Sequence, residues 1–149
     1  MTGNQQQAET KRIINEITAA FYQSFTNKEG AKPNVREIYQ QFVPVGLIIK
    51  NTGSAPEIYN LQQFVEPREK LLTDGLLVDF EEEELAERTE IFGNIAHRLS
   101  LYRKAGVLSG ETFETKGMKT MQFIKTPDGW KLSSVAWDDE RDGLKILEK

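Results

Sequence analysis

The apolar residues near the N-terminus recur with the period of an α-helix. Their spacing of i, i+3, i+7 and i+11 places them on one face of a helix of about four turns: Ile14, Ile17, Phe21 and Phe25. Thr10 is a suitable N-cap for this helix, and Gly30 is suited to a left-handed cap at its C-terminal end. The pattern therefore predicts one long amphipathic helix that buries a single apolar face.

Two capping patterns predict further helices in the first half of the chain. Asn34 and Glu37 have the N-cap and N3 spacing of a capping box, and apolar residues follow them. The segment 60–63 repeats that spacing and leads into an apolar run that extends to Leu72. Pro67 lies inside this run, where it is expected either to kink the helix or to mark the first turn of a new one.

Strand patterns dominate the second half of the chain. A short β-branched run at 45–49 is already typical of a strand. Residues 91–102 then alternate with period two, so His97 shares an apolar face with Ile95 and Leu99. Because helices come first and antiparallel strands follow, we predict an α+β fold with the helices on one face of the sheet.

The last two strands, within residues 118–137, are predicted to form a hairpin across a Thr-Pro-Asp-Gly turn. A loop of about three residues pairs Thr126 with Trp130. The same register, followed to the far end, places Lys119 opposite Trp137. Both faces of the hairpin are then substantially apolar: one carries Ile124, Trp130, Leu132 and Ala136, and the other carries Met121, Phe123, Val135 and Trp137.

A hairpin with two apolar faces needs a cover on each face. An antiparallel sheet with one solvated face alternates between apolar and polar side chains, and this hairpin does not. Two compatible explanations stay open. A homodimer could form through the sheet, or the sheet could curve around an apolar pocket.

Composition excludes several classes of site and partner. The chain has 149 residues, a net charge of −4, no cysteine and one histidine. An acidic chain is not expected to bind nucleic acid, and no apolar run approaches the roughly 20 residues that span a bilayer, so no membrane partner is expected. The lack of cysteine excludes disulfides and zinc–thiolate sites and fits a cytoplasmic location. One histidine and the absence of nucleotide-binding motifs predict no metal site and no cofactor.

Length and pattern predict a single domain without internal repeats. Residues 1–8 are polar and Gln-rich, so we expect a disordered leader there. Residues 9–142 are predicted to form the domain, and 143–149 a C-terminal tail.

The order of elements and the local sequence resemble the NTF2-like superfamily, and within it the SnoaL-like branch of small bacterial proteins. The resemblance is carried by the helix end Ala20-Phe21-Tyr22, by residues 93–102 and 117–123, and by the Gly-Trp-Lys-Leu start of the final strand at 129–132. It implies a cone in which a curved antiparallel sheet wraps around N-terminal helices and encloses an apolar pocket, often in a dimer formed through the sheet. The superfamily includes isomerases, dehydratases and binding modules, and no catalytic residue is transferred from it.

His97 is the candidate catalytic residue. On the apolar face of a strand it could look into the pocket, where a neutral imidazole can move protons near pH 7. The alternative is a core histidine with structural partners. A pocket would also need a carboxylate, and one extended face carries four: Asp79, Glu81, Glu83 and Glu90. The plainer interpretation of that face is an acidic edge exposed to solvent.

Arg68 could clamp an anionic ligand, because a guanidinium suits carboxylates. Its alternative role is a structural ion pair with Glu82 or Glu84. The predicted pocket-lining residues are aromatic or flexible and apolar: Tyr22, Phe25, Met121, Phe123 and Trp137.

These patterns favour a protein that binds a small hydrophobic compound. If it is an enzyme, cofactor-free acid–base chemistry of the isomerase or dehydratase type is the expected class. The alternative is a binding or dimerisation module without catalysis, and the sequence leaves both open.

Overall fold

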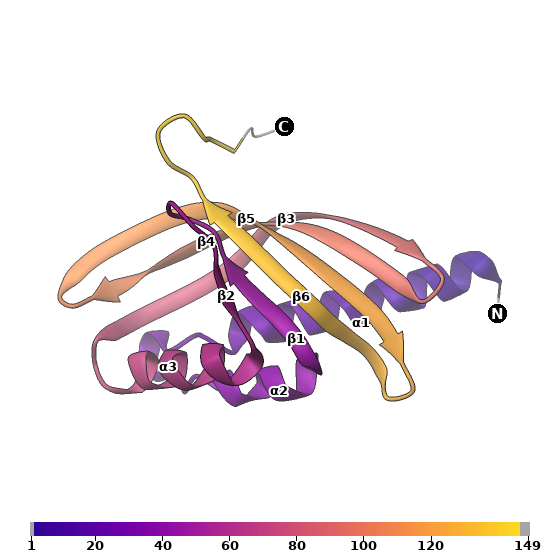
Figure 1. Ribbon diagram of the computed structural model, residues 1–149, viewed down its shortest axis with the longest axis horizontal. Helices are drawn as coiled ribbons and strands as arrows, with labels where there is room; N and C mark the ends of the chain where they lie inside the picture. Colours follow the sequence, from indigo (N-terminus) through magenta and orange to yellow (C-terminus); the bar gives the residue numbers. More distant parts are fainter. Residues whose placement is uncertain (1, 147–149) are drawn as a thin grey trace.

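The computed structural model describes residues 2–146, in which three α-helices pack beneath one curved sheet (Figure 1). The helices are α1 (Gly3–Gln23), α2 (Ile38–Gln41) and α3 (Leu61–Thr73), with 3₁₀ turns at Lys28–Gly30 and Val35–Glu37. The strands are β1 (Phe42–Lys50), β2 (Glu57–Tyr59), β3 (Leu77–Phe92), β4 (Ile95–Leu108), β5 (Glu111–Thr126) and β6 (Gly129–Asp139). Their order in the sheet is β2-β1-β6-β5-β4-β3.

The sheet is mixed, because β6 lies between β5 and β1 and runs parallel to β1. All other neighbouring strands are antiparallel. The predicted α+β fold, with a curved sheet around the N-terminal helices, is confirmed, whereas a wholly antiparallel sheet is wrong. The single parallel pair arises because the chain completes the β3–β6 meander and then returns alongside a strand that it formed much earlier.

The first helix begins earlier than its apolar pattern indicates. Thr2 is the N-cap: its hydroxyl accepts a hydrogen bond from the Gln5 amide at 3.1 Å, and the Gln5 side chain accepts one from the Thr2 amide at 2.7 Å. Residues 3–8, predicted as a leader, therefore form the first turns of α1. A capping box needs no apolar period, so the apolar stripe of α1 does not indicate its first turns.

The other two helices differ in how well their caps were predicted. The Asn60 capping box forms as predicted, with Gln63 as its partner. α3 continues through Pro67 as one helix. The capping box predicted at Asn34 does not form, because its side-chain amide contacts the Glu37 carboxylate at 3.4 Å instead of capping a helix.

The alternation of β4 is confirmed, but its faces are reversed relative to the prediction. Ala96, Arg98, Ser100 and Tyr102 are buried, whereas Ile95, His97 and Leu99 are exposed. The polar side chains can face inward because they are satisfied there: Arg98 donates two hydrogen bonds to Glu84, and Ser100 donates one to the same carboxylate. The apolar face of this strand is therefore its outer face.

The hairpin register is wrong near the turn and right beyond it. Thr126 pairs with Gly129, which leaves a shorter loop than expected. A bulge that leaves Ser133 unpaired then restores the predicted pairing of Lys119 with Trp137. As a result, the side chains of the last strand that were assigned to opposite faces are all buried on one side: Trp130, Leu132, Val135 and Trp137.

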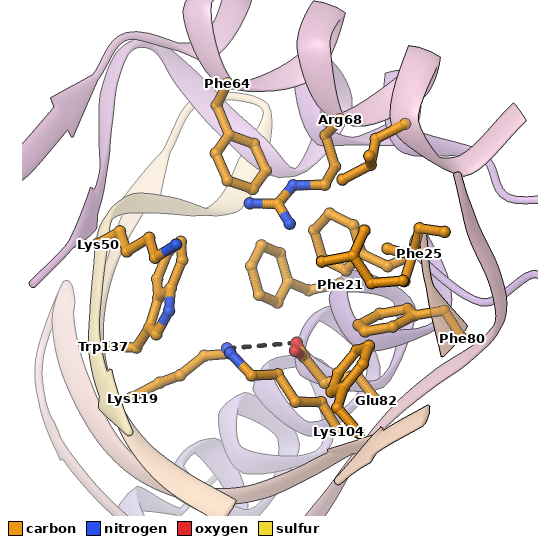
Figure 2. A pocket seen from close by; sticks show the side chains of 14 residues that line it. Phe21, Phe25, Lys50, Phe64, Arg68, Phe80, Glu82, Lys104, Lys119 and Trp137 are labelled. Carbon is orange, nitrogen blue, oxygen red and sulfur yellow. Dashed lines mark ion pairs between the residues drawn. The ribbon is translucent and has the colours of Figure 1, made fainter. Parts of the chain in front are cut away.

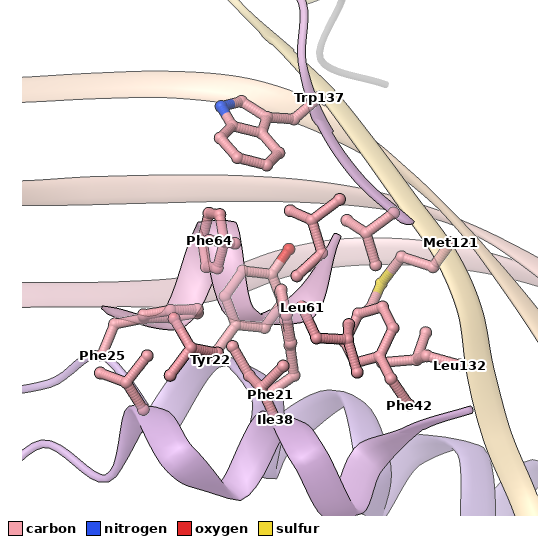
Figure 3. Close-up of a cluster of buried hydrophobic side chains, with 14 of the residues drawn as sticks. Phe21, Tyr22, Phe25, Ile38, Phe42, Leu61, Phe64, Met121, Leu132 and Trp137 are labelled. Atoms are coloured by element: carbon pink, nitrogen blue, oxygen red, sulfur yellow. The ribbon is translucent and has the colours of Figure 1, made fainter. Parts of the chain in front are cut away.

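The hydrophobic core lies between the helices and the inner face of the sheet (Figure 3). Phe21 packs edge-on against Phe25 at a centroid distance of 5.3 Å, and Phe42 packs on its other side at 6.1 Å. Met121 and Leu132 close the core from the sheet and are fully buried. Each such side chain contributes about 1.5–3 kcal/mol to folding, which fixes α1 against the strands that build the site.

Candidate functional site

A cavity of about 200 Å³ remains between the helices and the inner face of the sheet (Figure 2). Its aromatic wall consists of Phe21, Phe25, Phe64, Phe80, Phe113 and Trp137. Its charged side chains are Lys50, Arg68, Glu82, Lys104 and Lys119. An apolar cavity of about 150 Å³ is large enough to hold benzene, so this space suits a compound with a ring and a short substituent.

Strand pairing brings the inner charged residues together. Lys119 of β5 is the cross-strand partner of Trp137, and Lys104 of β4 is the partner of Glu82 on β3. Glu82 faces inward because a bulge interrupts β3 at Asp79, whose φ of 51° is unusual for a residue with a side chain. Cross-strand pairs on one face are close neighbours, so the sheet itself assembles this part of the cavity.

Lys119 and Glu82 form a buried ion pair on the cavity floor. The Lys119 ammonium lies 3.2 Å from a Glu82 carboxylate oxygen, and the two side chains are only 4% and 8% exposed. Three rings surround the ammonium, with centroids at 3.9 Å for Tyr102, 4.9 Å for Trp137 and 5.4 Å for Tyr22. Burial lowers the pKa of Lys119, and the Glu82 carboxylate acts in the opposite direction. The pair is a proton donor and acceptor placed in apolar surroundings.

Lys104 has a carboxylate partner just outside the cavity lining. Its ammonium lies 3.1 Å from Asp139, and the Tyr102 hydroxyl donates to the same carboxylate. Burial, with the adjoining Asp139 carboxylate, raises the pKa of Tyr102 well above its ordinary value. Tyr102 is therefore a neutral hydrogen-bond donor, and the charge of Lys104 is compensated.

Arg68 lies at the opposite end of the cavity from the floor pair (Figure 2). Its guanidinium stacks over Phe64 at 5.0 Å from the ring centroid. Within residues 2–146 it forms no ion pair, because Glu82 pairs with Lys119 and Glu84 is held by Arg98. The predicted structural ion pair of Arg68 is therefore wrong. Loss of hydration at this position lowers the pKa of Arg68.

The predicted ligand-binding residues divide into three groups. Phe25 and Trp137 line the cavity as expected. Tyr22 lies next to the floor pair, where its ring contacts Lys119 and its hydroxyl bonds to Ser100, but it does not line the space. Met121 and Phe123 are buried in the core away from the cavity.

His97 lies outside the cavity. Its side chain is 59% exposed, and its ring nitrogen is 3.2 Å from the Glu90 carboxylate on the neighbouring strand. The expectation that its face looks into the pocket is wrong, because the inner face of β4 is the polar one. His97 therefore lacks the apolar surroundings on which its predicted role in proton transfer depended.

The acidic residues of β3 are also reversed. The four carboxylates predicted for the pocket do not line the cavity: Asp79, Glu81, Glu83 and Glu90. Glu82, from the alternate face of the strand, is the carboxylate inside. The bulge at Asp79 shifts the strand parity by one residue, so an alternation counted from the start of the strand assigns the wrong face. Phe80 was the local signal for the correct face, because an inward Phe places the residue two positions later, Glu82, on the same side.

Among residues 2–146, no three His, Asp or Glu side chains form a group that could hold a metal ion. Across the same residues, no helix is long and apolar enough to cross a bilayer.

Comparisons with known proteins identify structural neighbours only. No family model and no curated protein matches the sequence. A nuclear transport factor 2 (NTF2-like) superfamily protein from Salmonella enterica superposes with a TM-score of 0.72 at 18% identity, covering 88% of this chain and 91% of that one. An NTF2-like protein with a cystatin-like fold from Novosphingobium aromaticivorans gives 0.67 at 14% identity, covering 91% and 84%. A calcium/calmodulin-dependent kinase II association domain assigned in Exiguobacterium sibiricum gives 0.65 at 10% identity, covering 95% and 96%.

Proposed function

We propose that this domain, which has the NTF2-like fold, binds a small hydrophobic compound in the cavity beneath its sheet. The observation that supports this is the floor pair of Lys119 and Glu82 within aromatic walls. A buried ion pair contributes little to stability compared with apolar packing. A fold that needed only a core would have filled the space with aliphatic side chains, so the open volume and the polar floor together favour a ligand.

Binding can be followed through Trp137, which lines the cavity. The chain has two tryptophans, so Trp130→Phe leaves Trp137 as the only fluorescent indole. We expect the neutral probe 3-phenylpropanamide to change its emission in a saturable way. Leu71→Phe, which narrows the cavity, should weaken the response, and Leu85→Phe on the exposed outer face should not. No response up to millimolar probe would overturn the proposal.

The floor pair also supports cofactor-free acid–base chemistry. On a carbonyl compound, the Glu82 carboxylate would accept a proton from the carbon next to the carbonyl, and the Lys119 ammonium would stabilise the enolate oxygen. If the compound is a β,γ-unsaturated carbonyl, return of that proton to the γ carbon moves the double bond into conjugation and completes an isomerisation with no change in atoms or electrons. This assigns to Glu82 and Lys119 the role that the sequence suggested for His97.

Proton abstraction is measurable as deuterium uptake. In D₂O, the hydrogens on the carbons next to the carbonyl of 4-phenyl-2-butanone should be replaced by deuterium faster when the protein is present than when it is absent. NMR measures this rate. Glu82→Gln should reduce the accelerated rate by about 10²-fold or more. Glu83→Gln, at an exposed position on the same strand, is the matched control. Unchanged exchange in the Glu82→Gln protein, with its fold intact, would exclude this role.

A second candidate function is self-association through the outer face of the sheet. The exposed apolar side chains of this face include Leu47, Ile58, Ile95 and Leu99. Cross-strand pairing extends the patch, because Ile95 faces Ile124 and Ile58 faces Ile49. Such a surface fits a second copy of the chain better than solvent, and one structural neighbour is described as an association domain.

Light scattering after size-exclusion chromatography tests this second candidate. At micromolar concentration we expect a mass of two chains. Leu99→Glu should shift it toward one chain, whereas Leu144→Glu, beyond the sheet, should leave it unchanged. A wild-type protein that is strictly monomeric would rule out the dimer.

We also expect a cytoplasmic location. The chain contains no cysteine, which is compatible with a reducing compartment. A fluorescent fusion observed in cells would test this directly, and signal confined to another compartment would contradict it.

A further inference from the structure

We infer that the compound bound in this cavity carries a carboxylate, and that Arg68 binds it. This inference rests on the proposed function, because it assumes that a small hydrophobic compound occupies the space. Four of the five charged side chains that line the cavity are cationic, although the chain as a whole has a net charge of −4. The concentration of positive charge in one cavity of an acidic protein is the first indication of an anionic ligand.

Pairing within the protein accounts for only part of this positive charge. Glu82 compensates Lys119, and Asp139 compensates Lys104. Arg68 and Lys50 have no ion-pair partner within residues 2–146. An arginine that lines an aromatic cavity and forms no ion pair within residues 2–146 favours an anionic partner, and a ligand carboxylate would supply it.

The surroundings of Arg68 hold its guanidinium in place. It stacks on Phe64, and that ring is fixed edge-on by Phe25 at 6.0 Å and by Trp137 at 6.1 Å. Within residues 2–146, Arg68 donates no hydrogen bond to a protein acceptor. A guanidinium binds a carboxylate through two parallel hydrogen bonds, so its N–H groups are available to a ligand carboxylate.

The two ends of the cavity also give the ligand a direction. Arg68 and Lys50 are partly exposed, whereas Lys119 and Glu82 are almost completely buried. A carboxylate at the Arg68 end would retain part of its hydration, and the apolar body would extend past Phe21 toward the floor pair (Figure 2). The ligand class is therefore a hydrophobic monocarboxylate whose reactive or recognised part lies far from its charge.

The test compares two probes of nearly equal shape, 3-phenylpropanoate and its neutral amide, by titration of Trp137 emission. We expect the carboxylate to bind about 10- to 100-fold more tightly, the usual range for hydrogen bonds to a charged group. Arg68→Gln should remove this preference, measured as the ratio of the two dissociation constants. Arg88→Gln, at a side chain that is 75% exposed, is the matched control.

The outcomes separate this inference from the proposed function. If both probes bind equally to the wild-type protein, the carboxylate inference is wrong and the binding function stands. If neither probe binds, the proposed function fails. If Arg68→Gln keeps a normal melting temperature and still prefers the carboxylate, the role of Arg68 is wrong. If Arg68 does bind the carboxylate, Arg68→Lys should keep only part of the preference, because lysine keeps the charge but lacks the paired N–H donors of the guanidinium.

Discussion

The phenol ring of Tyr102 lies directly over the Cα of Gly117, its cross-strand partner on β5. The Tyr102 hydroxyl passes this glycine to donate to the main-chain carbonyl of Asp138 at 3.2 Å and to the Asp139 carboxylate. A side chain at position 117 would occupy the volume of that phenol. Gly117 is therefore required for space, since its backbone is not in the left-handed region.

Gly117→Ala should destabilise the fold by about 1–3 kcal/mol, the usual cost of overpacking. The added methyl group would displace Tyr102, which is fully buried and contacts Lys119. Urea denaturation measures the free energy of unfolding. Gly53→Ala is the control, because a methyl group there meets no atom within 4 Å. Equal stability of the two variants would show that Tyr102 moves aside without cost.

The floor pair should show strong coupling in a double-mutant cycle. Lys119→Met leaves the Glu82 carboxylate buried without its partner, and we expect a loss of about 3–5 kcal/mol. Combining it with Glu82→Leu should recover much of that loss, because apolar replacement of a buried pair is often neutral. Purely additive single effects in chemical denaturation would contradict a paired interior.

An exposed pair provides the comparison for that cycle. Arg12 and Glu16 lie on the surface of α1 with their charged atoms 2.6 Å apart. The corresponding cycle there should give a coupling of about 0.3–0.5 kcal/mol. A similar coupling at both sites would mean that the floor pair is solvated in solution.

Arg98 should be essential for docking α1 on the sheet. Its side chain is 3% exposed, and it bonds to Glu84 and, at 2.8 Å, to Asn15 of α1. Arg98→Met leaves the Glu84 carboxylate without its main partner, so a loss of about 3–5 kcal/mol is expected. Hydrogen exchange should also accelerate in α1 before it does in β5. Equally accelerated exchange throughout the chain would argue against Arg98 as a specific anchor of α1. Arg88→Met, at an exposed side chain, is the control and should change neither the free energy of unfolding nor the exchange rates.

Glu81 predicts a small acid-dependent contribution to stability. Hydrogen bonds from Arg103 at 3.0 Å and then from Lys28 at 3.1 Å lower the pKa of Glu81 below its ordinary 4.5. The unfolded chain therefore binds more protons near that pH, so the stabilisation is present above pH 4.5 and is lost as pH falls. The melting-temperature difference between wild type and Glu81→Gln should shrink toward zero between about pH 5 and about pH 3. A difference that stays constant over this range would exclude the linkage.

Local patterns in the sequence predicted much of the fold. The apolar stripe that includes Ile14 and Phe21 is buried as expected, and the Asn60 capping box starts α3. The alternation around His97 correctly indicated a strand. These features depend on neighbours within a few residues, so the sequence displays them directly.

The candidate site was only partly predictable. Phe25 and Trp137 were identified because aromatic residues on the inner surface of a cone-shaped fold commonly line its pocket. Lys119 and Glu82 were missed, because charged residues within polar stretches are usually solvated and nothing local marks them as partners. Arg68 was identified as a possible clamp, but the sequence could not show that the carboxylates near it are used by other residues.

By itself, the sequence determined the two longer helices, the run of strands that follows them, and the α+β class, because hydrophobic period and capping are local properties. Tertiary structure alone decided which face of each strand turns inward. One bulge at Asp79 and another at Ser133 each shift the side-chain parity by one residue, and a strand with period two then exchanges its faces. The charged cavity is a product of these shifts: Arg68, Glu82 and Lys119 are far apart along the chain, and only the curvature and register of the sheet bring them around one space.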